Sequence, residues 1–149
     1  MPRLIKRKAG GNKMALLFPS GEWLDALVEE LNSNQVYREA AKNWEGDFYF
    51  IIEPEGNLKD KVIAYMDLWH GGCRSANIVT DENEKSPEFR IRAPLGKWRR
   101  VLEKQINPIQ AMLTGQLKVR GNMMKIVKTP RAALELVNCC SRIPTAFPE

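Results

Sequence analysis

The segment from Phe89 to Lys128 changes its hydrophobic period twice within a short stretch of chain. Residues 89–93 alternate apolar and basic side chains, as a strand with one buried face does. Residues 95–106 and 108–113 carry apolar side chains at helical spacing, and residues 117–120 alternate again. This pattern predicts a strand, two helices and a further strand that follow one another closely in a single domain.

Four polar positions are predicted to cap further helices. Ser20 precedes apolar residues at helical spacing from Trp23 to Leu31. Asn32 begins the spacing of a capping box and predicts a second helix. Asn122 and the Thr129-Pro130 pair are expected to begin the last two helices.

Residues 47–80 alternate with a period of two and predict a meander of three strands. Residues 54–57 form the first turn, and His70-Gly71-Gly72 forms the second. The polar loop at residues 81–87 is expected to be mobile.

At 149 residues and 17.0 kDa, the chain is large enough for one domain with a single core. Its net charge of +5 lies in residues 1–13, which hold five basic and no acidic side chains, while the rest of the chain is neutral. We therefore expect a flexible basic tail at residues 1–13 and a single domain at residues 14–149. The tail is either a solubilising segment, which is the commoner case, or an arm attracted to anionic lipid.

The cysteines Cys73, Cys139 and Cys140 do not form a disulfide framework, and the adjacent pair is badly placed for a mutual bond. This usage predicts a reducing compartment, the cytoplasm. His70 and Cys73 have ligand-like spacing, so a zinc site of three cysteines and one histidine is an alternative. Neighbouring helix residues point about 100° apart, which disfavours joint ligation by the adjacent pair, and we predict no metal.

The sequence lacks the residue patterns of nucleophilic catalysis and nucleotide binding. Its single histidine lies in a glycine turn, and no GxSxG elbow or phosphate loop is present. No apolar run approaches the roughly 20 residues of a membrane-spanning helix. We therefore expect a protein without enzymatic activity or cofactor.

Met112, Met123 and Met124 lie in the elements around the last predicted strand. Flexible thioethers suit a cavity wall that adapts to ligands of different shape. A methionine stripe at helical spacing is more often plain core, so periodicity alone favours core and leaves a cavity as the alternative.

Three motifs together resemble the sterol carrier protein type two family. They are the Phe48-Tyr49-Phe50 strand, the glycine turn after an acid-bearing strand at Asp67–Gly71, and a longer pattern at Asn107–Asn122. The longer pattern reads Asn-Pro-x-x-Ala-x-x-x-Gly-x-Leu-Lys-x-x-Gly-Asn. The match extends from about Gly46 to Lys128 without a large gap.

The resemblance implies an α+β fold with a five-stranded, mostly antiparallel sheet and helices packed on one face, enclosing an apolar tunnel. Family members hold one lipid in this tunnel and move it between membranes. The resemblance thus implies a non-catalytic intracellular lipid-binding or lipid-transfer protein for an acyl chain, acyl-CoA, isoprenoid or sterol-like ligand. Carried over by position, the ligand-binding residues are Phe50, Ile52, Met66, Ile91, Trp98, Leu102, Met112, Leu113, Met123, Ile126 and Val127.

Two features depart from the family pattern. Residues 130–149 are longer than the family's short terminal helix, and two N-terminal helices replace one, so both could cover or fill the tunnel. The outer sheet face would carry an apolar patch, which we expect either the N-terminal helices or the second subunit of a homodimer to cover. The patch consists of Tyr49, Ile51, Ile63, Tyr65 and Trp69.

The sequence leaves three functions open. The first is binding of a lipid or fatty acyl ligand, whose anionic head group would meet Lys97, Arg100, Lys125 and Arg131. The second is a basic arm that makes transient contact with an anionic membrane or, less favoured, with nucleic acid. The third is an accessory domain that presents an apolar substrate to an enzyme.

Overall fold

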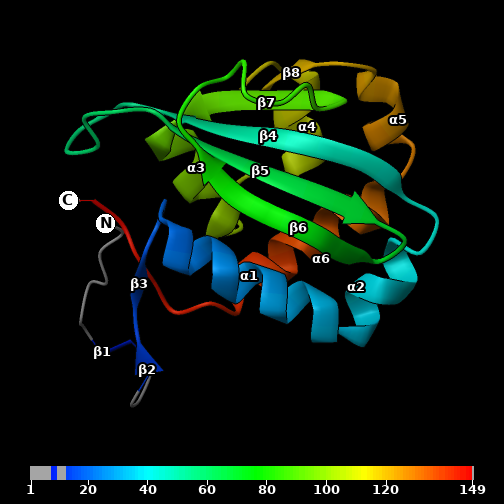
Figure 1. The fold of residues 1–149 in the computed structure, drawn as a ribbon, viewed down its shortest axis with the longest axis horizontal. Coiled ribbons are helices and arrows are strands. Elements are labelled where there is room, and N and C mark those ends of the chain that lie inside the picture. Colours follow the sequence, from blue (N-terminus) through cyan, green and yellow to red (C-terminus); the bar gives the residue numbers. More distant parts are fainter. Residues whose placement is uncertain (1–7, 10–12, 149) are drawn as a thin grey trace.

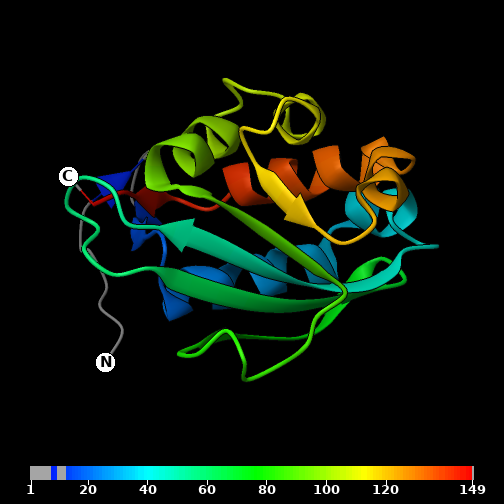
Figure 2. The same cartoon turned by 90° about the horizontal axis from the view of Figure 1, so that it is seen from above.

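The computed structural model describes residues 8–9 and 13–148. These residues form two layers, a twisted five-stranded sheet and a set of helices that packs against one of its faces (Figure 1, Figure 2). The predicted α+β fold is confirmed.

The sheet has the strand order β6-β5-β4-β7-β8. Strands β4, β5 and β6 form the predicted antiparallel meander, β7 runs parallel to β4, and β8 pairs antiparallel with β7. Alternation along β4 places Phe48 and Ile52 on the helix-covered face and Tyr49 and Ile51 on the outer face. The strand bounds are β4 Glu45–Glu53, β5 Val62–Trp69, β6 Gly72–Val79, β7 Phe89–Pro94 and β8 Lys118–Arg120.

The helices begin and end where the sequence predicts breaks. The Oδ1 atom of Asn107 accepts hydrogen bonds from the backbone N–H groups of Ile109 (2.8 Å) and Gln110 (3.2 Å), which caps α4. Pro108 takes the first helical position, where its missing N–H costs nothing. The helix bounds are α1 Gly21–Ser33, α2 Gln35–Ala40, α3 Leu95–Leu102, α4 Pro108–Leu113, α5 Met123–Val127 and α6 Pro130–Ser141.

Three of the four predicted N-cap residues stand at that position, and only the prediction for Asn32 is wrong. Ser20 caps α1 as predicted, but Asn34 rather than Asn32 caps α2. Asn32 instead exchanges two hydrogen bonds with the backbone of Cys73, at 2.7 and 3.1 Å, and so joins α1 to β6. Two further predicted caps make no side-chain cap bond within the described part of the chain: Asn122 and Thr129.

The predicted cover of the outer sheet face by the N-terminal helices is also wrong. Both N-terminal helices pack on the opposite face, and the loop at residues 80–88 lies over the outer apolar cluster instead. Tyr49 and Ile51 are fully buried beneath it, so the cluster needs no second subunit for cover. Trp69 stands apart from this cluster and is covered in part by the guanidinium of Arg74, 4.0 Å above its ring. The outer cluster consists of Tyr49, Ile51, Ile63, Tyr65 and Val79.

Polar contacts join this loop to the sheet. The hydroxyl of Tyr49 accepts a hydrogen bond from the backbone N–H of Lys85 (2.7 Å) and donates one to its carbonyl (3.1 Å). The Glu82 carboxylate accepts hydrogen bonds from Arg90 and Arg92, each at 2.9 Å. A polar loop thus covers an apolar face because its backbone and its acid are paired with groups on the sheet.

The two ends of the described chain meet at one end of the molecule (Figure 1). Strand β3 (Leu16–Leu17) pairs in parallel with β9 (Thr145–Ala146), and we call this two-stranded pairing the terminal clasp. The indole N–H of Trp23 donates a hydrogen bond to Thr145 Oγ1 at 2.9 Å, which ties α1 to the clasp.

The predicted basic tail falls mostly outside the described residues. In the part that is described, β1 (Lys8–Ala9) pairs antiparallel with β2 (Lys13–Met14). The rest of the expectation concerns residues 1–7 and 10–12, which are not described.

Residues 8–9 and 13–148 contain neither a candidate membrane span nor a candidate metal cluster. No helix in this range has the length and apolarity needed to cross a membrane. In the same range, His, Cys, Asp and Glu side chains nowhere gather in a group of three that could hold a metal ion.

Candidate functional site

A cavity of about 130 Å³ lies between the sheet and the helices. Its floor is the inner sheet face, helices α1, α2, α3, α4, α5 and α6 supply most of the rest of its wall, and connecting segments supply Phe18, Pro19, Ser20, Trp44, Leu117 and Thr129. The sheet residues that line it are Phe48, Phe50, Ile52, Ala64, Met66, Leu68, Ile78 and Ile91. The helical residues include Trp23, Leu24, Leu27, Tyr37, Trp98, Val101, Leu102, Pro108, Met112, Ile126, Ala132, Ala133, Leu136, Val137 and Cys140.

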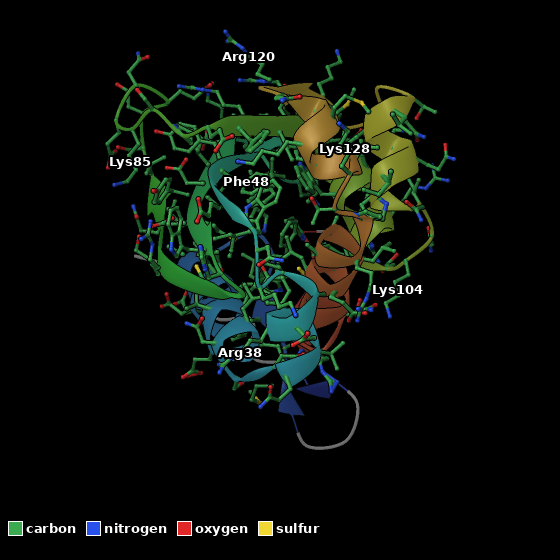
Figure 3. All side chains as sticks on the ribbon, turned by 90° about the vertical axis from the view of Figure 1, so that its right-hand side faces the viewer. Arg38, Phe48, Lys85, Lys104, Arg120 and Lys128 are labelled. Carbon is green, nitrogen blue, oxygen red and sulfur yellow. The ribbon has the colours of Figure 1, made fainter. Side chains whose placement is uncertain are left out.

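Aromatic side chains build the floor of the cavity at its centre. The ring of Phe48 stacks on Phe50 and Phe89, with centroids 5.0 and 5.1 Å away, and Trp44 continues the stack at 5.8 Å. Figure 3 shows Phe48 between the sheet and the helical layer. Phe48, Phe50 and Phe89 stand on β4 and β7, which are interior strands of the sheet, so the floor is the rigid part of the site.

The indole of Trp98 anchors α3 to the sheet. Its N–H donates a hydrogen bond to the carbonyl oxygen of Ile51 at 3.0 Å, and its ring meets Phe50 edge to face with centroids 6.0 Å apart. Because its polar atom is paired, this large side chain presents only apolar surface to the cavity.

The size of the cavity limits what it admits without movement. A cavity of about 150 Å³ lined by aliphatic and aromatic side chains binds benzene, whereas sites for drug-sized ligands begin near 300 Å³. At about 130 Å³ the cavity is therefore suited to a narrow apolar group such as part of an alkyl chain. A larger guest requires the walls to move apart.

Most of the residues expected to bind ligand lie on the wall of this cavity. The eight that line it are Phe50, Ile52, Met66, Ile91, Trp98, Leu102, Met112 and Ile126. Leu113 was expected on the helical wall, but its side chain is 51% exposed, because it stands on the solvent side of α4. Met123 packs against the core at its edge, and neither it nor Val127 lines the cavity.

Sequence reasoning missed the contribution of α1, α2 and α6. Trp23, Leu24 and Leu27 face the cavity from the apolar side of α1, and Leu136 and Val137 do so from α6. The signal was present, since both helices show apolar residues at a spacing of three and four. Periodicity says which side of a helix is buried but not whether that side meets a cavity or solid core.

The cavity wall carries no charged side chain among the described residues. Burial raises the pKa of Cys73 to about 11, and burial likewise raises the pKa of the Cys140 thiol on the wall. Both thiols are therefore protonated near neutral pH and are poor nucleophiles. The chemistry that this site offers is the burial of apolar surface.

The four basic residues expected around one head group are not brought together. Lys97 and Arg100 lie on α3, while Lys125 and Arg131 lie on α5 and α6, toward the opposite end of the molecule (Figure 1). The ammonium group of Lys125 already donates hydrogen bonds to the backbone carbonyl of Glu45 (2.6 Å) and to the carboxylate of Glu88 (2.9 Å). One anionic head group cannot meet all four.

An apolar cavity enclosed by a five-stranded sheet and a layer of helices defines a small domain built around an internal apolar site. A family model described as the SCP-2 sterol transfer family matches residues 24–132, which is more than half of the chain. This chain therefore belongs to the SCP-2 sterol transfer family.

Solved structures agree with this assignment. The chain is 34% identical to a sterol carrier protein 2, with 83% of this chain and 96% of that chain covered and a TM-score of 0.72. It is 28% identical to a conserved hypothetical protein from Thermus thermophilus, with 97% and 95% covered and a TM-score of 0.75. Sterol carrier protein 2 from Yarrowia lipolytica shares the fold, at 18% identity, 78% and 88% coverage and a TM-score of 0.54. No curated protein matches this chain.

Proposed function

We propose that this chain is a non-catalytic lipid-binding or lipid-transfer protein, which holds the apolar part of its ligand between sheet and helices. The observation that carries the proposal is the cavity of about 130 Å³, whose lining is apolar throughout the described residues apart from a few hydroxyl and thiol groups. Burial of an alkyl chain there supplies the driving force, at roughly 25 cal/mol per Å² of apolar surface. The similarity to a sterol carrier protein 2 supports the same function.

A ligand longer than the cavity enters when the helical wall moves away from the sheet. Strands β4 and β5 are paired on both sides and hold the floor, whereas α4, α5 and α6 are short or amphipathic helices at the rim. Methionine on this wall adapts to the shape of the guest. The three free cysteines are consistent with work in the cytoplasm, where the protein would contact membranes only transiently.

Filling the cavity tests this function. Ala64 lies on the floor, and its partners in the neighbouring strands are Phe50 and Ile78. We expect Ala64→Phe to weaken binding of a fluorescent fatty acid by roughly tenfold or more, because the new ring takes the space of the alkyl chain. The matched control is Asn77→Phe, which adds the same ring to an exposed position on the sheet.

The expected result is a large loss of affinity in Ala64→Phe and none in Asn77→Phe. Native mass spectrometry of the purified wild-type protein gives a second readout, since a retained lipid appears as added mass. Unchanged affinity in a folded Ala64→Phe variant would contradict binding in this cavity. A wild-type protein that neither retains nor binds any lipid would contradict the function itself.

A further inference from the structure

Tyr37 is one of the few hydroxyl-bearing side chains on the cavity wall, with Ser20 and Thr129. It stands on α2, is 2% exposed, and lines the cavity together with Trp44 and Phe48. Its phenolic oxygen makes no hydrogen bond to another described residue, and since it is not among the fully buried side-chain atoms that lack a partner, it keeps some accessible surface. Burial raises the pKa of Tyr37 well above its ordinary range, so the group stays protonated and can both donate and accept.

The polar tips of the other aromatic residues on the wall are all paired. The indole N–H groups of Trp23, Trp44 and Trp98 donate to Thr145 Oγ1 (2.9 Å), to the Gly46 carbonyl (3.0 Å) and to the Ile51 carbonyl (3.0 Å).

The remaining two tyrosines are paired as well. The hydroxyl of Tyr49 bonds the backbone of Lys85 in both directions, and Tyr65 donates to Asp47 Oδ2 at 2.9 Å. Tyr37 is thus the exception among the tyrosines of this chain.

A hydroxyl that makes no hydrogen bond within the protein contributes little to the stability of the fold, and phenylalanine would fill the same space. The neighbours of Tyr37 offer little relief, because the groups that raise its pKa beyond burial are the thiols of Cys73, Cys139 and Cys140, which are weak hydrogen-bonding partners. The hydroxyl of this cavity-lining residue is therefore free to pair with a molecule inside the cavity.

We propose that the Tyr37 hydroxyl is the hydrogen-bonding anchor for an uncharged polar group of the bound lipid, a hydroxyl or a carbonyl. The proposal rests on the proposed function, since it needs a lipid in the cavity. The cavity wall holds no basic side chain among the described residues, so a carboxylate at Tyr37 would lose its hydration without gaining a counterion. A neutral group needs only the one hydrogen bond that Tyr37 provides.

This anchor also orients the ligand. Tyr37 lies where α2 meets α6, at the end of the molecule that faces the viewer in Figure 3, where its sequence neighbour Arg38 is labelled. Phe18, which directly follows the clasp strand β3, lines the cavity at the other end. The polar end of the lipid therefore points toward α2 and α6, and its alkyl chain points toward the clasp.

Ligands that differ in one group test the anchor. We would compare 1-dodecanol, dodecanoate and dodecane at pH 8 by displacement of a fluorescent fatty acid. Tyr37→Phe is expected to weaken 1-dodecanol roughly threefold to tenfold, the effect of one net hydrogen bond, and to leave dodecane unchanged. The wild-type protein is expected to bind 1-dodecanol more tightly than dodecanoate.

Two readouts separate an anchor from a packing residue. Tyr37→Phe is expected to keep or raise the melting temperature, because it removes an unpaired hydroxyl from the folded state. In the variant, the ¹³C resonance of a labelled carbonyl in bound 2-dodecanone is expected to move upfield, because a hydrogen bond that deshields it is lost. The control Tyr65→Phe removes a hydroxyl from the opposite sheet face and is expected to change no affinity.

Each other outcome overturns the proposal. Equal affinity of the wild type and Tyr37→Phe for 1-dodecanol would remove the anchor while leaving lipid binding intact. A parallel loss of dodecane binding would make Tyr37 a packing residue. Tighter binding of dodecanoate would refute the uncharged head group, and a wild-type protein that binds none of the compounds would refute the proposed function along with the anchor.

Discussion

Gly71 occupies a turn in which two independent constraints exclude a side chain. Its φ of 82° is in the left-handed region, and a Cβ at this position would lie 2.5 Å from the carbonyl oxygen of Arg38. The turn between β5 and β6 therefore packs directly against the backbone of α2, the helix that carries Tyr37. We predict that Gly71→Ala lowers the free energy of unfolding by about 3 kcal/mol, measured by chemical denaturation.

Gly56 is the control, because it has the positive φ of Gly71 without a close neighbour. Its φ is 58°, yet no atom lies within 4 Å of a Cβ built there. Gly56→Ala should therefore carry only the conformational cost, roughly 1 kcal/mol. If the two variants lost the same free energy of unfolding, the close approach of α2 to the turn would not contribute to the cost of Gly71→Ala.

At the scale of single residues, the sequence predicts which side of an element is apolar. Alternation put Phe50, Met66 and Ile91 each on an apolar strand face, the family resemblance placed them on the wall of the site, and all three line the cavity. Leu113 was misplaced because in the short helix α4 a small error in the helical phase moves a side chain from the wall to solvent. Tyr37 gave no signal, since a tyrosine on an apolar helical face looks the same whether or not its hydroxyl is paired.

At the scale of elements, the loop at residues 80–88 shows how a polar segment can cover an apolar face. Burial acts to raise the pKa of Glu82, but hydrogen bonds from Lys61, Arg92 and Arg90 outweigh it, so the pKa of this carboxyl is lowered. A carboxyl whose pKa is lowered by folding stabilises the protein above its unfolded pKa, and this contribution is lost as the pH falls through the lower folded value.

The variant Glu82→Gln should expose this contribution. At pH 7 we expect it to be less stable than the wild type by roughly 1 kcal/mol, the upper range for a partly exposed ion-pair group. Because the wild type loses the same contribution in acid, the difference should shrink as the pH falls below the ordinary glutamate range. Chemical denaturation at several pH values measures it, and a difference that does not depend on pH would contradict the role of the charge.

The sequence predicts a strand or helix correctly where the spacing of apolar residues and the local breaks alone determine it. The alternation of β4 to β6 and the Asn107-Pro108 break each appear in the structure where the sequence indicates. Asn32 failed as a cap because a tertiary partner, the backbone of Cys73, takes its amide group. The cover of the outer sheet face by residues 80–88 was not predicted for a similar reason. Its partners Arg90 and Arg92 belong to β7, and the local sequence does not show that β7 lies beside β4.

At the scale of the whole molecule, the terminal clasp closes one end of the cavity. Phe18 and Trp23 line the cavity at this end, and both are held by the last residues of the chain. The Trp23 indole bonds Thr145 Oγ1, and the Phe18 ring meets Phe147 edge to face, with centroids 5.7 Å apart. The sequence showed an extended C-terminal segment but not its partner, because the pairing of β3 with β9 joins residues from opposite ends of the chain.

A chain that ends at Ile143 should therefore release its lipid faster. Without β9 and Phe147, the side chains that close this end lose their support, so the alkyl chain gains a second exit. We expect the rate of transfer of a fluorescent fatty acid to vesicles to rise severalfold and the free energy of unfolding to fall by about 2 kcal/mol, as expected for lost packing and an unpaired indole. A chain that lacks only residues 148–149 retains the clasp and serves as the control. An unchanged transfer rate in the shorter chain would show that lipid leaves only at the end formed by α2 and α6, where Tyr37 lies, and that the clasp contributes to stability alone.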